Sequence, residues 1–326
     1  MNDTPMTRAY ARLALHEALR HHFSDRNVTL IEFGFKEQEG RLLEDELAVR
    51  FHVRQKLYGH ALEMAVETGQ TRRIPEKIGM FQTDVSEGTY YPHRWGWGTQ
   101  WPTTSNDRAV RTEPMRGGIS ISDEYHYAYG TLGGLVRDRM SGAELILSNW
   151  HVLAVDWWAR PGQRIFQPGR LDGGNHTQTV ATLMRDGMSQ NLDAAVAVLN
   201  GQRRLINEQL GLGPIRGVVQ PKLGLEVIKS GRRTGITRGR VVAVEGVAKI
   251  RYGYVERLIR HVVRIEPVWA GGEVSGPGDS GAIWLEKATM RALGLHFAGS
   301  NMPEEALALD MLSVLNALNI DLVTTA

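Results

Sequence analysis

The chain has 326 residues, of which 42% are hydrophobic and 23% charged, the ordinary balance of a globular protein. Its net charge of +2 creates no strong field for nucleic acid or anionic lipid, so neither is expected as a partner. Cysteine is absent, which excludes a disulfide framework and favours a reducing compartment such as the cytoplasm. No stretch approaches the roughly 18 apolar residues of a membrane span, and the start has no secretory signal pattern, so a cytoplasmic protein is expected.

The N-terminal part is predicted to form a small α+β domain. Thr4 followed by Pro5 is typical of a helix start, and residues 6–23 place alanine, leucine and phenylalanine on one helical face. Two strand-like segments, 28–35 and 46–53, flank a polar turn and predict a hairpin, while residues 72–95 are typical of loops with one short strand. A polar, tryptophan-containing stretch at 96–113 predicts a connection, so we place the domains at 1–110 and 111–326.

From residue 117 onward, short strands are separated by glycine-rich turns, which predicts a mainly β barrel or sandwich. Near the end, Leu309, Leu312, Leu315 and Leu318 recur at helical spacing. We therefore expect a C-terminal helix over residues 306–318 that closes the β domain.

Three segments of this β region carry chemically active side chains. His151 follows an apolar strand, Asp193 comes directly before another, and Ser280 lies in a turn flanked by Gly278 and Gly281. A serine hydroxyl becomes nucleophilic near pH 7 only when a base takes its proton, and a carboxylate must orient that base. Glycines around the serine let backbone N–H groups converge where negative charge develops on a substrate carbonyl.

These segments, in the order His, Asp, Ser and with an intact Gly278-Asp279-Ser280-Gly281 turn, resemble the chymotrypsin-like serine endopeptidases. The resemblance covers roughly residues 117–320 and looks closest to bacterial intracellular members with a leader domain, through the segments 130–136 and 229–237. It implies a double β-barrel, no cofactor, no metal, and a protein or peptide substrate. Carried over by position, it implies Ser280 as nucleophile, His151 as general acid–base, Asp193 as orienting carboxylate, and the N–H groups of Gly278 and Ser280 as oxyanion hole.

The resemblance does not say which group pairs with the carboxylate of Asp279 in this chain. In the animal enzymes the acid before the serine pairs with a new N-terminal amine made by cleavage, yet about 115 residues precede the β domain here. Either the chain is cut near Arg116-Gly117-Gly118, or Asp279 has an internal partner. We favour the internal partner.

The segment 294–299 would be the strand that pairs with bound substrate, with His296, Phe297 and Gly299 as substrate-binding residues. It is similar to the matching strand of glutamyl endopeptidases, so His296 would favour an acidic residue at P1. Val274, near the usual base of the P1 pocket, carries no charge, so a preference for basic residues is not expected.

Other clusters have simpler interpretations. His16, His21 and His22 have a spacing that suggests metal, but no other ligand completes a site, and a solvated helix face is favoured. The Lys and Arg residues between 222 and 264 are typical of solvated strand edges rather than of a nucleic-acid surface.

Two alternatives to a constitutive protease stay open. A pseudoprotease would keep the barrel as a binding module, although every catalytic residue type is present here. A latent regulatory protease would cut one dedicated partner after a signal that its N-terminal domain receives.

Overall fold

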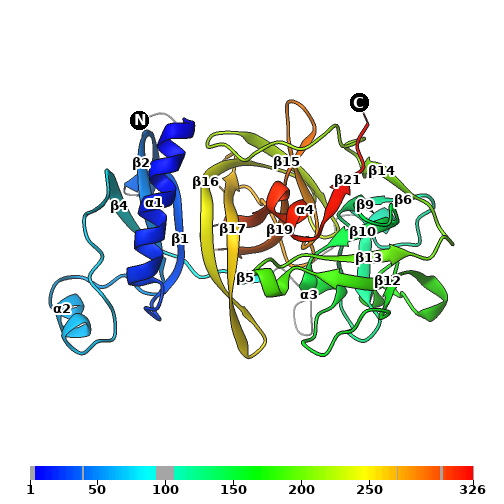
Figure 1. Cartoon of the computed structure of the whole chain (residues 1–326), viewed down its shortest axis with the longest axis horizontal. Helices are drawn as coiled ribbons and strands as arrows, with labels where there is room; N and C mark the ends of the chain where they lie inside the picture. Colours follow the sequence, from blue (N-terminus) through cyan, green and yellow to red (C-terminus); the bar gives the residue numbers. More distant parts are fainter. Residues whose placement is uncertain (1–3, 39, 93–105, 270, 302–303, 326) are drawn as a thin grey trace.

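The computed structural model describes residues 4–38, 40–92, 106–269, 271–301 and 304–325. Strands dominate these residues, which confirms the predicted mainly β class. No helix within these ranges is long and apolar enough to cross a membrane. The N-terminal strands, a central pair of long strands and the strands of residues 115–209 follow one another along the longest axis of the molecule (Figure 1).

The N-terminal part packs a helix on strands, as predicted. Thr4 caps the first helix by accepting a hydrogen bond from the Thr7 N–H, with Pro5 as its first residue. The predicted hairpin is also present, whereas a second helix falls in a segment for which no helix was predicted. The elements of this part are α1 (Pro5–His22), β1 (Val28–Gln38), β2 (Arg41–Val53), α2 (Gly59–Glu67), β3 (Lys77–Ile78), β4 (Phe81–Glu87) and β5 (Tyr91–Pro92).

The first β unit of the larger region is an eight-stranded sheet in the order β21-β9-β10-β13-β12-β11-β7-β8. A short helix, α3 (Trp150–Leu153), follows β10, and a separate parallel pair joins β6 (Met115–Gly117) to β14 (Leu205–Gln209). The strands of the sheet are β7 (Ser120–Asp123), β8 (Gly130–Thr131), β9 (Gly134–Asp138), β10 (Glu144–Ser148), β11 (Arg164–Phe166), β12 (Thr179–Asp186), β13 (Ala195–Leu199) and β21 (Ile320–Leu322). Within the described ranges, single-turn 3₁₀ helices occupy connections at Asn106–Arg108, Arg170–Asp172, His176–Gln178 and Met188–Gln190.

The second β unit belongs to an eleven-stranded sheet that also takes in the N-terminal strands. β1 pairs antiparallel with β16, with Phe33 opposite Val244 and Gly34 opposite Ala243. A Cβ on Gly34 would overlap the Ala243 side chain, so glycine permits this close approach. The elements of this unit are β15 (Glu226–Gly231), β16 (Gly235–Tyr252), β17 (Val255–Pro267), β18 (Ile283–Glu286), β19 (Arg291–Asn301), β20 (Glu304–Asp310) and α4 (Met311–Ala317).

The C-terminal helix is present but shorter than predicted. It begins at Met311, with Asp310 as its N-cap, whereas residues 306–310 belong to β20 between β17 and β19. Ala306 and Ala308 pack into one apolar cluster of the chain, and Leu307 and Leu309 pack into the other. A strand buried on both faces has no alternating pattern, which is why these residues were wrongly assigned to the helix.

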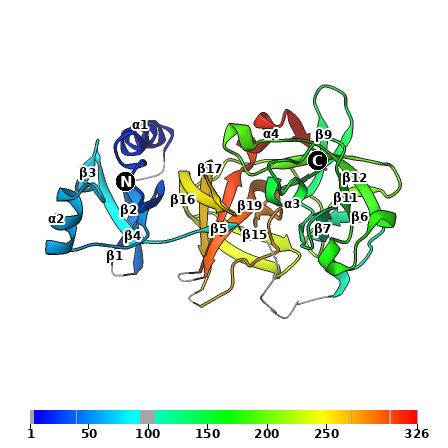
Figure 2. The same ribbon diagram turned by 90° about the horizontal axis from the view of Figure 1, so that it is seen from below.

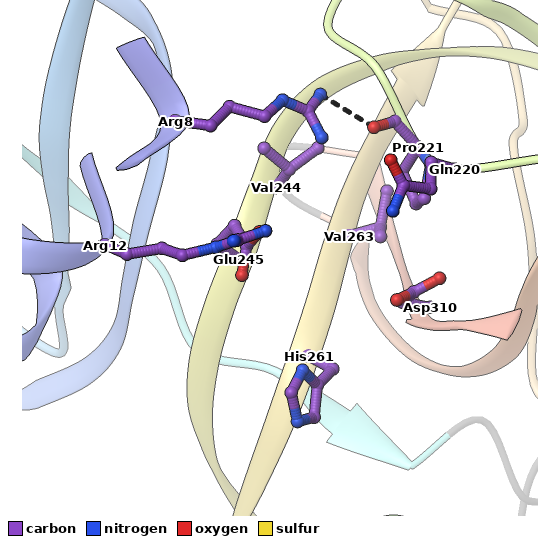
Figure 3. Close-up of a pocket in the computed structure, with 9 residues that line it drawn as sticks. All are labelled: Arg8, Arg12, Gln220, Pro221, Val244, Glu245, His261, Val263 and Asp310. Carbon is purple, nitrogen blue, oxygen red and sulfur yellow. Dashed lines mark hydrogen bonds and ion pairs between the residues drawn. The ribbon is translucent and has the colours of Figure 1, made fainter. Parts of the chain in front are cut away.

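Polar contacts reinforce the attachment of α1 to the second unit (Figure 3). Arg8 donates a hydrogen bond of 2.7 Å to the carbonyl oxygen of Pro221, and Arg12 forms an ion pair with Glu245 at 2.7 Å. Beneath them, one apolar cluster runs from Leu15 and Phe33 to Val241 and Trp284. The N-terminal strands and the second β unit therefore share a core.

Candidate active site

The end of β10 delivers the predicted histidine, and the start of β13 delivers the predicted aspartate. His151 lies in α3, where its backbone N–H donates to Oδ1 of Asp193 at 3.1 Å and its Nδ1 lies 2.5 Å from Oδ2. Asn149 also donates to the Asp193 backbone carbonyl at 2.6 Å. Both side chains of the pair are buried. A carboxylate held in this way fixes the ring orientation and directs the second nitrogen, Nε2, away from itself.

Nε2 of His151 is buried and has no hydrogen-bond partner among the described residues. A buried ring nitrogen without a partner is costly in a finished core, because its lost hydration is not replaced. It is the atom that a general base would present to an incoming hydroxyl proton.

Tyr252 is a third member of this cluster, which no local sequence pattern indicates. Its hydroxyl donates to Oδ2 of Asp193 at 2.6 Å. Burial first, and then the charge of Asp193, raises the pKa of Tyr252 well above its ordinary value, so the hydroxyl stays a donor. Tyr252 ends β16, and its distance of 59 residues from Asp193 along the chain explains why local patterns did not reveal it.

The serine turn has the backbone that its glycines suggested. Gly278 has φ of +111° and Gly281 has φ of +98°, values that residues with a Cβ rarely adopt. A Cβ on Gly278 would meet the ring of Tyr129, and one on Gly281 would meet the Thr131 carbonyl oxygen. Within the described residues, the N–H groups of Gly278 and Ser280 donate no hydrogen bond. The turn thus presents two unpaired donors two residues apart.

Asp279 has an internal partner, as we expected. Its carboxylate accepts from Lys229 Nζ at 2.8 Å and from the Thr234 hydroxyl at 2.5 Å. The N–H groups of Arg233 and Thr234 also donate to it, at 2.8 and 3.0 Å. Burial alone would raise the pKa of Asp279, but the charge and hydrogen bond of Lys229 outweigh it and hold the pKa below its ordinary value.

The serine turn and α3, which carries His151, both lie next to Gly130 at the junction of the two β units. Ser280 is fully buried, and its Oγ lies 3.3 Å from the carbonyl oxygen of Phe297. The Thr131 N–H donates to the Ser280 carbonyl at 2.7 Å, which ties the serine turn to β8 of the first unit. A Cβ on Gly130 would lie 3.2 Å from that carbonyl oxygen and 2.5 Å from Val152, the neighbour of His151. The absence of a side chain at Gly130 therefore allows the serine turn and α3 to approach each other closely.

The predicted substrate-binding residues lie on β19, directly beside the serine turn. Gly281 donates to the His296 carbonyl at 2.9 Å, and the His296 N–H donates to Ala282 at 2.9 Å. His296 is fully buried, with its ring edge-on to Trp284 at a centroid distance of 6.2 Å. Phe297 is buried, and Gly299 is paired with Tyr91 of β5.

Two cavities adjoin this arrangement. One, of about 560 Å³, lies beside His151 and is also lined by Pro92, Trp157 and Tyr254. The other, of about 410 Å³, lies beside the serine turn and is lined by Arg233, Glu273, Ser275 and Glu304, among others. The second cavity has ionisable groups of both signs in its walls.

No family model matches the chain, and no curated protein matches it. Among solved structures, it is similar to a chymotrypsin from Cellulomonas bogoriensis, with 18% identity, a TM-score of 0.48, and coverage of 66% of this chain and 100% of that one. Protease A of Thermobifida fusca has 16% identity and a TM-score of 0.49, with 65% and 99% covered. A glutamic acid-specific serine protease, described as using a histidine triad in substrate binding, has 19% identity and a TM-score of 0.49, with 64% and 100% covered. The likeness to these serine proteases concerns the fold.

Proposed function

We propose that the chain is a serine endopeptidase that hydrolyses peptide bonds of protein or peptide substrates, with Ser280 as nucleophile, His151 as general acid–base and Asp193 as orienting carboxylate. The observation that carries the proposal is the hydrogen-bonded His151–Asp193 pair, whose Nε2 is buried and unpaired, at the same junction as a serine turn with two unpaired N–H donors.

In the proposed mechanism, Ser280 Oγ attacks the substrate carbonyl carbon while His151 Nε2 takes the hydroxyl proton. The carbonyl oxygen becomes an oxyanion, which the N–H groups of Gly278 and Ser280 stabilise. His151 then returns the proton to the leaving amine, the carbon–nitrogen bond breaks, and an acyl-enzyme forms. Water, deprotonated by His151, attacks the ester, the bond between the carbonyl carbon and Ser280 Oγ breaks, and His151 returns the proton to Oγ as the acid is released. No cofactor takes part in these steps.

Three finer elements belong to the same proposal. His296 would favour an acidic residue at P1, and the two-domain division at 1–110 and 111–326 would make the N-terminal part a leader domain that receives a regulatory partner. A cytoplasmic location is supported by the absence of cysteine. The alternative of a latent protease has one observation in its favour, which is the complete burial of Ser280.

Labelling with a fluorophosphonate probe tests the proposal, because such probes react with an activated serine. We expect the wild-type protein to be labelled and Ser280→Ala to stay unlabelled. A peptide library then tests the acidic P1 preference, which His296→Leu should reduce. A pseudoprotease would leave Ser280 unlabelled even after β5 has been released from β19 by the variant described below, and that result would overturn the proposal.

A further inference from the structure

Under the proposed protease function, the edge of β19 next to Ser280 is where an extended peptide is expected to pair. The carbonyl of Phe297 contacts Ser280 Oγ at 3.3 Å, and the backbone of His296 is hydrogen-bonded to the serine turn on both sides. A peptide whose carbonyl reaches Ser280 must therefore run along residues 297–299. Backbone pairing at a strand edge is a general mode of peptide binding.

This edge is already occupied by a segment of the chain itself. β5 pairs antiparallel with β19, with Tyr91 opposite Gly299 and Pro92 opposite Ala298. Figure 2 shows the chain running from the N-terminal strands through β5 to the side of β19. Pro92 also lines the cavity beside His151. The segment thus lies along the strand edge and beside the cavity that His151 lines.

The direction of β5 is that of a bound substrate. The step from Tyr91 to Pro92 matches the step from Gly299 to Ala298, which leads along β19 toward Phe297 and the serine. The acyl portion of a substrate approaching Ser280 along the same edge has this polarity. The reverse orientation would direct the chain away from the nucleophile.

A buried hydrogen-bond cluster holds the segment just before β5. The Tyr90 hydroxyl donates to Glu305 at 2.6 Å and lies 2.9 Å from Nδ1 of His52. The Thr29 hydroxyl donates to the Gly88 carbonyl at 2.6 Å, and the Gly88 N–H donates to Val53 at 2.9 Å. β5 itself has two residues, and Pro92 offers no N–H to the ladder. The position of β5 therefore depends more on this anchor than on its own pairing.

We propose that Tyr91-Pro92 occupies the expected substrate-binding edge of β19, from Phe297 to Gly299, as an intramolecular competitor of substrate. This inference rests on the proposed protease function. It adds that β5 blocks the substrate-binding edge of β19 in the free enzyme. Substrates displace β5 from this edge, and the surface favours peptides with proline opposite Ala298. Release of the Tyr90 anchor activates the enzyme.

A disulfide lock tests the proposal directly, because the natural chain has no cysteine. Pro92 and Ala298 face each other in an antiparallel pair, whose Cα separation of about 4.5–5.5 Å suits a disulfide. In Pro92→Cys/Ala298→Cys, we expect oxidation to reduce peptide hydrolysis and Ser280 labelling at least tenfold, and reductant to restore both. Each single-cysteine variant, oxidised in the same way, controls for the substitution itself.

A second variant opens the site and does not depend on cross-linking. Tyr90→Phe removes the hydroxyl that anchors the segment, and the loss of such a buried hydrogen bond corresponds to about a tenfold change in an equilibrium. We expect a rise of about tenfold in peptide kcat/KM and in the labelling rate. Tyr10→Phe makes the same change at a half-exposed tyrosine of α1 and should leave both rates unchanged.

The outcomes separate the two proposals. Equal rates in the oxidised and reduced double variant, together with an unchanged rate in Tyr90→Phe, would show that β5 does not compete with substrate while the protease function stands. Absence of Ser280 labelling in every form, Tyr90→Phe included, would instead remove the proposed function and this inference with it.

Discussion

Asp279 is buried next to Ser280, and its charge requires a partner inside the chain. Lys229, on β15, supplies that partner from a fully buried position and also lies over the Trp284 ring at 5.5 Å. Three backbone N–H groups share the carboxylate, including that of Gly276 in the serine turn at 3.1 Å. The ion pair therefore holds the turn that would form the oxyanion hole, without a cleaved N-terminus.

Lys229→Met tests this role at the scale of one residue. Removal of the lysine leaves a buried carboxylate without its cation, a change that costs about 3 kcal/mol or more in the free energy of unfolding. Denaturant unfolding measures the loss, and Lys229→Met/Asp279→Asn should recover part of it. Lys287→Met breaks an exposed pair with Glu226 and should cost much less than Lys229→Met, because water and salt screen exposed charges. Equal losses at Lys229 and Lys287 would contradict the assignment.

At the scale of elements, the β16–β17 hairpin links three parts of the molecule. It pairs with β1 along one edge and with β20 along the other. Its tip, where β16 ends at Tyr252 and β17 begins at Val255, reaches Asp193 of the first β unit. The same strand that binds the N-terminal part thus carries a hydrogen-bond donor to the candidate catalytic carboxylate.

Tyr252→Phe tests the contribution of this hairpin to catalysis. The variant keeps the ring but removes the donor to Asp193, so the carboxylate orients His151 with one contact fewer. We expect kcat to fall about tenfold with little change in KM, since a hydrogen bond to a charged group is worth about 1.5 kcal/mol. Steady-state kinetics on a peptide substrate measures both constants. Tyr127→Phe, at an exposed tyrosine, is the matched control, and a change confined to KM would argue against a positioning role.

At the scale of the whole molecule, a buried charge cluster joins the N-terminal strands to the second β unit. Arg264 of β17 bonds Glu32 of β1, Glu266 and Glu305, each at 2.6 Å. His52 of β2 lies 3.0 Å from Glu32 and extends the cluster to Tyr90. These groups come from four strands and from the segment before β5. Their packing therefore links the N-terminal part to Tyr90, which precedes the β5 segment paired with β19.

The cluster predicts a specific pH dependence of stability. Burial would raise the pKa of Glu32, but Arg264 and His52 outweigh it and lower the pKa from 4.5 to about 2. The unfolded chain then binds a proton at higher pH than the folded one, so this stabilisation is complete above pH 4.5 and is lost as the pH falls toward 2. Between about pH 6 and pH 3, Glu32 should account for a loss of about 2 kcal/mol in the free energy of unfolding.

Denaturant unfolding of the wild type and Glu32→Gln at several pH values tests this dependence. The variant should be less stable near neutral pH and should show a shallower decline on acidification. Glu256→Gln removes a carboxylate from an exposed pair with Arg54 and should keep the slope of the wild type. Identical slopes for Glu32→Gln and the wild type would show that Glu32 is not the titrating group.

The sequence by itself determined the features that a short segment specifies. The cap at Thr4 and Pro5, the first hairpin, the mainly β character and the glycine turn around Ser280 all follow from neighbouring residues, because capping, strand propensity and positive φ are local properties. Only the tertiary structure decided which strands share an edge. The contacts of Tyr252 with Asp193, β1 with β16 and β5 with β19 join residues far apart in the chain, and strand register between distant segments leaves no periodic signal. For the same reason the helix predicted over 306–318 wrongly includes residues 306–310 of β20, since a strand buried on both faces by distant partners has the composition of a buried helix.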